Sequence, residues 1–129
     1  MNLKHIETTH ILQHDQSDCG VACLLSIIKF YKGDCSLEKL RELSGTTQQG
    51  TTLLGLYQVA NQLGFNAEGF QANVMTLVEN EQPSIIHVTL ENQLQHYLVC
   101  YHYDNKKGFL VGDPAKGIYY LSPSKLNEI

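Results

Sequence analysis

The clearest pattern in the chain is a helical repeat of apolar residues that follows a polar beginning. Residues 1–17 are polar and rich in histidine, and they show no sustained period. Beyond them, apolar side chains recur at steps of three and four residues, at Val21, Leu24, Leu25, Ile28 and Tyr31. This spacing predicts a helix with one buried face. We expect Asp18 to cap its start and Gly33 to end it.

Three further helices are predicted. One covers residues 36–44; its first residue, a serine, is the expected cap, and Gly45 follows its end. Another starts at about Leu53 and ends at Gly64. The apolar residues of that helix share one face: Leu53, Leu56, Tyr57, Ala60 and Leu63. A short fourth helix is expected to start at Asn73.

After Pro83 the pattern changes to short runs of β-branched and aromatic residues. Four such runs predict strands, over residues 85–90, 97–103, 109–111 and 118–121. Helices followed by strands predict an α+β fold, in which N-terminal helices pack on a C-terminal antiparallel sheet. The chain has no internal repeat and no evident linker, so a single domain over residues 1–129 is expected.

Composition narrows the possible partners. The 129 residues are 43% hydrophobic and 17% charged, which excludes a disordered or low-complexity chain. Nine Lys and Arg against thirteen Asp and Glu give a net charge of -4 without a basic stripe, so nucleic acid is not an expected partner. The longest near-apolar run, residues 21–28, is too short to cross a bilayer, and the fragment alone is expected to be soluble.

The four cysteines are Cys19, Cys23, Cys35 and Cys100. The chain opens without the apolar segment of a secretory signal and is long enough to bury a core. We therefore expect free thiols in a reducing cytosol rather than disulfides. Cys19 and Cys23 lie one helical turn apart, but no second close pair follows, so neither a zinc site nor another cofactor is predicted.

Cys19 is the strongest candidate for chemistry. It falls in the first turn of a predicted helix, where free N–H groups and the helix dipole favour a thiolate. Gly20 follows it and is expected to leave the approach to the sulfur open. The alternative is that Cys19 is a small buried apolar residue, which is our expectation for the other three cysteines.

A nucleophilic thiol needs a base, and the base needs a group that orients it. Among six histidines, His96 stands at the start of a predicted strand, where its ring can reach toward a helix end. The leader histidines are expected at the solvated surface: His5, His10 and His14. Taken alone, His96 has an ordinary explanation as a structural or surface residue.

Two more residues complete a possible site. Asp113 ends the next strand, and in a hairpin it would lie close to His96 and hold the imidazole ring. Gln13 could supply a side-chain amide beside the Cys19 backbone N–H to stabilise an oxyanion. Each has an ordinary alternative, since Asp-Pro is a common turn and a lone Gln in a polar segment carries no information.

Taken together, the order Gln13, Cys19, His96, Asp113 is that of papain-like cysteine peptidases. Residues 13–24, QHDQSDCGVACL, resemble the cysteine box of the bacteriocin-processing peptidase domains, family thirty-nine of the cysteine peptidases. Those domains sit at the N-terminus of peptide-exporting ABC transporters. Five further stretches are similar to that family: residues 36–43, 50–56, 63–65, 96–99 and 113–114. The chain departs from the family at Ser26, where Met is common, and at Lys32, which separates Tyr31 from Gly33.

The resemblance implies a papain-like fold and a peptidase that removes a leader after a double-glycine motif while a transporter exports the remainder. By this carry-over Cys19 is the nucleophile, His96 the general base and then acid, Asp113 the orienting residue and Gln13 the oxyanion donor. It implies that the leader binds as an amphipathic helix on an apolar patch. The implied partners are the leader peptide and the transmembrane and nucleotide-binding domains of a transporter, at the cytoplasmic face of the membrane. Residues 1–129 would then be the N-terminal part of that longer chain.

Two other functions remain compatible with these residues. The chain could be a docking domain that binds export substrates without cutting them. The same Cys-His-Asp set could also serve an acyl transferase of the transglutaminase type, which would use amine acceptors instead of water.

Overall fold

The computed structural model describes residues 3–13, 16–68, 74–89 and 95–128. Seven segments of this part of the chain are helical: α1 Leu3–Thr9, η1 Gln16–Asp18, α2 Cys19–Phe30, α3 Leu37–Ser44, α4 Leu53–Gln62, α5 Val74–Glu79 and α6 Pro123–Glu128. Four are strands: β1 Ser84–Thr89, β2 Gln95–Asp104, β3 Gly108–Asp113 and β4 Gly117–Leu121.

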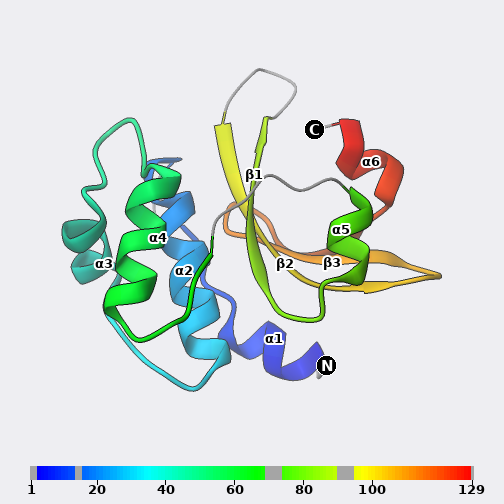
Figure 1. Ribbon diagram of the computed structural model, residues 1–129, viewed down its shortest axis with the longest axis horizontal. Coiled ribbons are helices and arrows are strands. Elements are labelled where there is room, and N and C mark those ends of the chain that lie inside the picture. Colours follow the sequence, from blue (N-terminus) through cyan, green and yellow to red (C-terminus); the bar gives the residue numbers. More distant parts are fainter. Residues whose placement is uncertain (1–2, 14–15, 69–73, 90–94, 129) are drawn as a thin grey trace.

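The strands form one antiparallel sheet in the order β1-β2-β3-β4, so each strand pairs with its neighbour in the sequence. Helices cover both of its faces: α2, α3 and α4 stand to the left of the sheet in Figure 1, and α5 and α6 to its right. One apolar cluster joins α1–α4 to the inner face of β2 and β3, and a second joins the other face to α5 and α6. The α+β prediction is therefore confirmed. The short helix expected near Asn73 corresponds to α5, but the sequence did not indicate that α5 and α6 would cover the second face of the sheet.

The beginning of the chain differs from the expectation of an irregular polar segment. Residues 3–9 form α1, whose Ile6 is fully buried in the core. After α1, the Ile11 backbone N–H donates to Ser26 Oγ of α2 at 2.9 Å. A seven-residue helix with one buried apolar side chain is too short to produce a detectable repeat, which explains why the pattern missed it.

Both ends of α2 lie near the predicted positions, but their chemistry differs. Asp18 occupies the cap position without a side-chain cap hydrogen bond, and its buried carboxylate instead pairs with Arg41 of α3. At the other end the left-handed residue is Lys32, with φ of 69°, rather than Gly33. The sequence therefore located the ends of this helix to within a few residues, but which group satisfies the free backbone atoms depends on tertiary contacts.

The start and end of α3 are as predicted. Ser36 Oγ accepts from the Lys39 N–H at 3.1 Å, and Gly45 adopts φ of 71°. In α4, however, the predicted apolar face is only partly buried. Leu56 and Ala60 lie in the core, whereas Leu53, Tyr57 and Leu63 are 48%, 42% and 41% exposed.

The short elements at the end are less well anticipated. The predicted start of the fourth helix, Asn73, and the predicted end of the first strand, residue 90, lie outside the described residues; α5 is described from Val74. The helix α6, whose Leu126 packs on the outer face of the sheet, had no signal in the sequence pattern.

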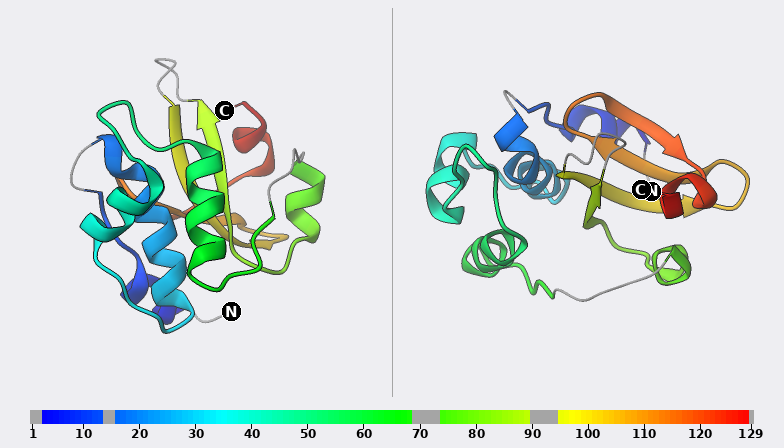
Figure 2. Two further views of the ribbon diagram at one scale, coloured as in Figure 1. Left: turned by 60° about the vertical axis from the view of Figure 1, so that its left-hand side comes forward. Right: turned by 90° about the horizontal axis from the view of Figure 1, so that it is seen from above.

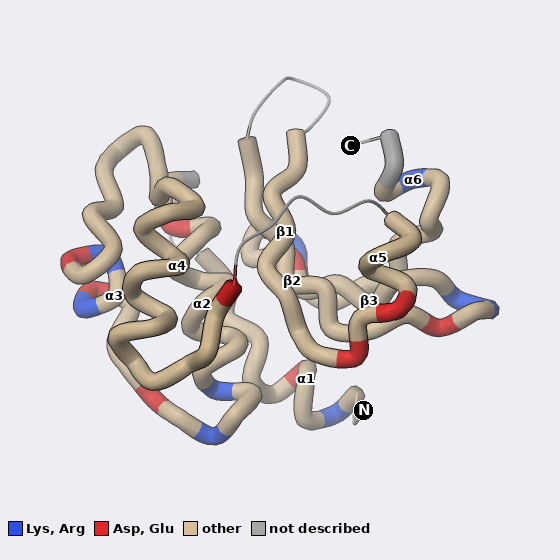
Figure 3. The backbone as a smooth tube through the Cα atoms, in the orientation of Figure 1, with Lys and Arg blue, Asp and Glu red and all other residues tan. Residues whose placement is uncertain are grey.

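Charged residues are interspersed along the backbone rather than gathered by sign, as the tube in Figure 3 shows. Within the described ranges, every helix is too short or too polar to cross a membrane.

Candidate active site

Cys19 is the first residue of α2, and it is 5% exposed. The next residue, Gly20, is tightly packed rather than open. A Cβ at Gly20 would lie 3.2 Å from Tyr97 Cδ2 and 3.3 Å from Leu56 Cδ1. The expectation that Gly20 leaves the sulfur approachable is therefore wrong, because β2 and α4 close over the position where a side chain would stand.

His96 and Asp113 come together across the sheet. His96 follows the first residue of β2, Asp113 is the last residue of β3, and both side chains are buried. Nε2 of His96 lies 2.8 Å from Oδ1 of Asp113. The Cys19 side chain lies near enough to this ring to raise the pKa of His96, and with Nε2 engaged by the carboxylate, Nδ1 is the nitrogen left for the thiol.

The surroundings of His96 favour its protonated form. The hydrogen bond to Asp113 and then the nearby Cys19 side chain raise the pKa of His96 to about 9, against the opposing effect of burial. At neutral pH this imidazole therefore carries a proton and a positive charge beside the sulfur.

Asp113 is held by donors from three directions. Burial alone would raise the pKa of this carboxyl, but hydrogen bonds from His96, from the Ala115 backbone N–H and from Tyr119 together lower it. Oδ1 accepts from Ala115 N at 2.8 Å, and Oδ2 accepts from the Tyr119 hydroxyl at 3.0 Å. Asp113 is thus kept ionised in a buried position.

The segment that carries Gln13 lies against the turn that follows Asp113. The Gln13 backbone N–H donates to the Pro114 carbonyl at 2.7 Å, and His10 Nε2 donates to the Asp113 carbonyl at 3.0 Å. The Gln13 side-chain oxygen Oε1 is buried without a hydrogen-bond partner among the placed residues. The structure therefore brings Cys19, His96 and Asp113 into contact and puts Gln13 beside Pro114.

Two leader histidines are not solvated surface residues, contrary to expectation. His5 Nε2 lies 2.7 Å from the Phe30 carbonyl, and burial lowers the pKa of His10 despite its hydrogen bond to Asp113. His14 lies outside the described residues. A polar stretch predicts exposure, whereas the contacts of these two histidines with distant residues, Phe30 and Asp113, give no periodic pattern in the sequence.

The remaining thiols are separate from this contact set. All four cysteines are free, as expected. Burial, then Cys19 and Asp113, raise the pKa of Cys23 well above its ordinary value, which fits the prediction of an inert core residue. Over the part of the chain that the structure describes, no three His, Cys, Asp or Glu side chains are arranged to hold a metal ion.

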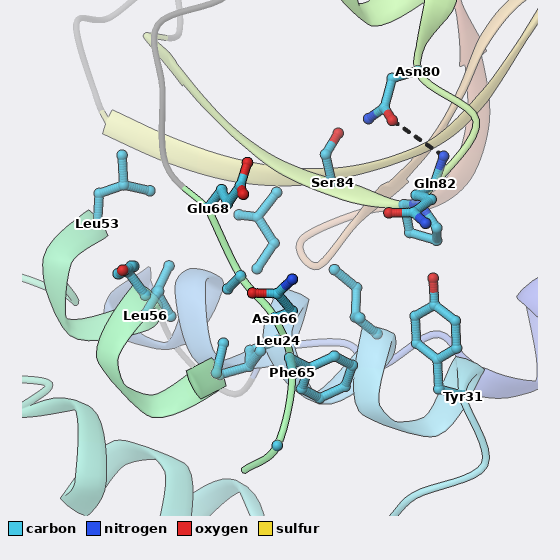
Figure 4. A pocket seen from close by; sticks show the side chains of 17 residues that line it. Leu24, Tyr31, Leu53, Leu56, Phe65, Asn66, Glu68, Asn80, Gln82 and Ser84 are labelled. Atoms are coloured by element: carbon cyan, nitrogen blue, oxygen red, sulfur yellow. Dashed lines mark hydrogen bonds between the residues drawn. The ribbon is translucent and has the colours of Figure 1, made fainter. Parts of the chain in front are cut away.

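An apolar groove includes Leu56, which also packs against Gly20, the residue after Cys19. Seventeen residues line it, from α2, α4 and the stretch 64–68 on one side and residues 80–85 on the other (Figure 4). Leu56, which touches the Gly20 position next to Cys19, is one of them, and Glu68 is the one charged lining residue. The exposed side chains of Tyr31, Leu53 and Tyr57 also lie in this groove.

Sequence reasoning missed three residues around these side chains. His10 and Tyr119 bind Asp113, and Arg41 pairs with the carboxylate that precedes Cys19. Asp113 pairs with Gly117, and Tyr119 lies two residues after Gly117 on the same face of β4. The register of this hairpin was therefore the signal that could have identified Tyr119 as a partner of Asp113.

The comparisons with known proteins all indicate the same family. Residues 7–129 match the Peptidase C39 family. The lactococcin-G-processing and transport ATP-binding protein LagD of Lactococcus lactis subsp. lactis is 40% identical over 109 residues, which make up 83% of this chain and 15% of that protein. This chain therefore spans about a sixth of the length of that curated relative.

Solved structures share the fold. The peptidase domain of Streptococcus ComA, a bi-functional ABC transporter involved in a quorum sensing pathway, has a TM-score of 0.83 and 37% identity, covering 92% of this chain and 88% of that one. A double glycine motif protease from an AMS/PCAT transporter, in complex with its leader peptide, has a TM-score of 0.78 at 22% identity over 92% and 81% of the two chains. These matches confirm the papain-like fold, and together with the family match they support cysteine peptidase activity. This chain belongs to the Peptidase C39 family.

Proposed function

We propose that this chain is a cysteine peptidase that removes the leader of an exported, bacteriocin-like peptide after a Gly-Gly motif. The observation that carries the proposal is the hydrogen bond of His96 to Asp113, with Cys19 at the start of α2 near enough to raise the pKa of the same imidazole. A thiol, an imidazole and a carboxylate in this order form the minimum set for acyl transfer through a covalent intermediate.

In the proposed mechanism the Cys19 sulfur attacks the carbonyl carbon of the second glycine. The His96 imidazolium, formed with the thiol's proton, gives a proton to the leaving amine as the C–N bond breaks, and a thioester forms on Cys19. The same imidazole then takes a proton from a water molecule that hydrolyses the thioester, and the thiol returns. Asp113 remains ionised throughout, holds the ring by Nε2 and stabilises its positive charge.

Gln13 is the proposed oxyanion donor. Its carboxamide nitrogen would act with the Cys19 backbone N–H, which is one of the free N–H groups at the start of α2. The two hydrogen bonds that hold residues 10–13 to Asp113 and Pro114 support this assignment, because they fix the donor's backbone to the turn that carries the orienting carboxylate.

The proposed substrate follows from what the relatives process and from the groove. LagD is a lactococcin-G-processing protein, and a double glycine motif protease of the same fold is described with a leader peptide. The apolar groove, which includes Leu56 beside Gly20, suits the apolar face of a leader helix.

We further propose that residues 1–129 are a single peptidase domain at the N-terminus of a peptide-exporting ABC transporter. Its partners would be the transmembrane and nucleotide-binding domains, and cleavage would take place at the cytoplasmic face of the membrane. The support is that LagD is a transport protein of which this chain matches only 15% of the length.

Mass spectrometry of the domain mixed with a Gly-Gly leader peptide tests the proposal. We expect two products from cleavage after the second glycine, loss of cleavage in Cys19→Ala, and retained cleavage in the matched control Cys23→Ala, whose thiol is one helical turn away. Cleavage by Cys19→Ala would contradict the assigned nucleophile. Binding of an uncut peptide would instead favour a docking domain, and transfer of the leader to an added amine in preference to water would favour an acyl transferase.

A further inference from the structure

We infer that Tyr119 is a positioning residue for the proposed reaction, in which its hydroxyl fixes the orientation and the ionised state of Asp113. This inference rests on the proposed peptidase function. The carrying observation is that Oδ2 of Asp113 accepts a hydrogen bond from the Tyr119 hydroxyl at 3.0 Å, in a position where the carboxylate is 4% exposed.

The two oxygens of Asp113 have different partners. Oδ1 accepts from His96 and from the Ala115 backbone N–H, each at 2.8 Å. For Oδ2, Tyr119 is the hydrogen-bond donor that the described residues supply. A carboxylate with one oxygen unsatisfied and shielded from water would rotate about its terminal torsion or take up a proton, so this donor keeps Oδ1 directed at the imidazole.

The β3–β4 hairpin makes the contact possible. Asp113 is opposite Gly117 in the strand pairing, and Tyr119 lies two residues further along β4 on the same face of the strand. This diagonal relation brings a tyrosine hydroxyl back to the carboxylate. The Tyr119 ring packs on the outer apolar cluster, with Phe109 and Val111 among its members, which holds the phenol in place.

Other titratable groups lie near Asp113, and any test must distinguish their effects on Asp113 from the effect of Tyr119. They are His96 from β2, His10 from the segment after α1, and the thiols of Cys19 and Cys23 from α2. Tyr119→Phe leaves all four in place and removes only the hydroxyl. Tyr120→Phe, on the next residue, is the matched control, because it removes a hydroxyl while keeping a ring over which Lys107 lies.

The first experiment measures cleavage kinetics against pH for both variants. For Tyr119→Phe we expect kcat to fall about tenfold, the typical loss when one hydrogen bond to a charged group is removed, with KM unchanged. We expect the acid limb of the kcat profile to move to higher pH, because Asp113 protonates more easily without this donor. Tyr120→Phe should keep the wild-type profile, and a Tyr119→Phe profile equal to wild type would overturn the inference.

A second experiment needs no turnover. The side-chain carboxyl carbon of Asp113, labelled with ¹³C and assigned by comparison with Asp113→Asn, is titrated by NMR in the resting protein. Its pKa should rise in Tyr119→Phe and fall when Tyr119 is replaced by 3-fluorotyrosine, a stronger donor of nearly the same shape, which also serves if Tyr119→Phe does not fold. An unchanged titration in a folded variant refutes the positioning role, whereas a wild-type protein that fails to cut the peptide refutes the proposed function instead.

Discussion

At the scale of single residues, the site depends on one histidine that contacts a carboxylate and a thiol. Chain order and residue type were enough to single out Cys19, His96 and Asp113 as candidates for a nucleophile, a base and an orienting group, because each role calls for a recognisable residue type. Two residues that bind Asp113 from outside this set were missed: Tyr119 donates to its carboxylate, and His10 donates to its backbone carbonyl. Histidines and tyrosines have many ordinary uses, and these two reach Asp113 only through the β3–β4 pairing and through the packing of the segment after α1.

The raised pKa of His96 predicts how stability depends on pH. Its folded value of about 9 lies above the unfolded value of about 6.5, so the favourable contribution of the imidazolium is complete below pH 6.5 and is lost as the pH rises through 9. We expect the free energy of unfolding, measured by urea titration, to decrease between these pH values in the wild-type protein. His96→Gln should show a clearly weaker decrease over the same interval, and equal slopes for the two proteins would contradict the assigned contact.

His10 produces the opposite dependence. Burial lowers its pKa below the unfolded value, so its contribution is complete above about pH 6.5 and is lost as the pH falls. Both wild type and His96→Gln keep His10, so the effect of His10 cancels when the free energies of unfolding of the two proteins are subtracted.

At the scale of elements, the sequence predicted the ends of a helix where the helix has its own capping residues. It did not predict helices that are very short. Ser36 and Gly45 delimit α3 by backbone chemistry that any structure would need. By contrast, α1 and α6 have seven and six residues, and their few buried side chains give no period. Their positions follow from the sheet faces that they cover, which the sequence of each helix does not contain.

The contact between α3 and α4 predicts a sensitive glycine. A Cβ on Gly55 of α4 would lie 2.5 Å from the Ser44 carbonyl oxygen at the end of α3, so the two helices must separate to accept it. We expect Gly55→Ala to lower the free energy of unfolding by about 1–3 kcal/mol, although alanine favours helix. Urea denaturation measures this, with the exposed Gln58→Ala of the same helix as control. A Gly55→Ala protein as stable as wild type would show that the helices are not held at this distance.

At the scale of the whole molecule, the sheet, its covering helices and the groove form one arrangement around Cys19. The order of helices before strands predicted this architecture correctly. The groove could not be predicted, because a stripe of apolar residues at helical spacing has the same sequence pattern whether it faces the core or a partner. On α4 the stripe does both: Leu56 is buried, while Leu53 and Tyr57 remain exposed along the groove.

The groove assignment predicts an effect on substrate binding. Tyr57 is 42% exposed and lines the groove, so Tyr57→Asp places a charge where we expect the apolar face of the leader. We expect KM for a full leader peptide to rise about tenfold or more, from the loss of one buried apolar side chain, with kcat little changed. Met75→Asp is the matched control, since Met75 is 65% exposed on α5, across the sheet. An equal rise in KM for both variants would exclude specific binding of the leader in this groove.

Covalent trapping tests whether a Gly-Gly peptide delivers its carbonyl to Cys19. A leader peptide that ends in a glycylglycyl chloromethyl ketone should alkylate the attacking thiol, and peptide mapping by mass spectrometry then locates the adduct. We predict one adduct, on Cys19, although Cys35 is the more exposed thiol, and we predict that an excess of uncut leader slows its formation. Labelling that follows exposure and falls on Cys35, or a protein that stays unlabelled, would contradict this account.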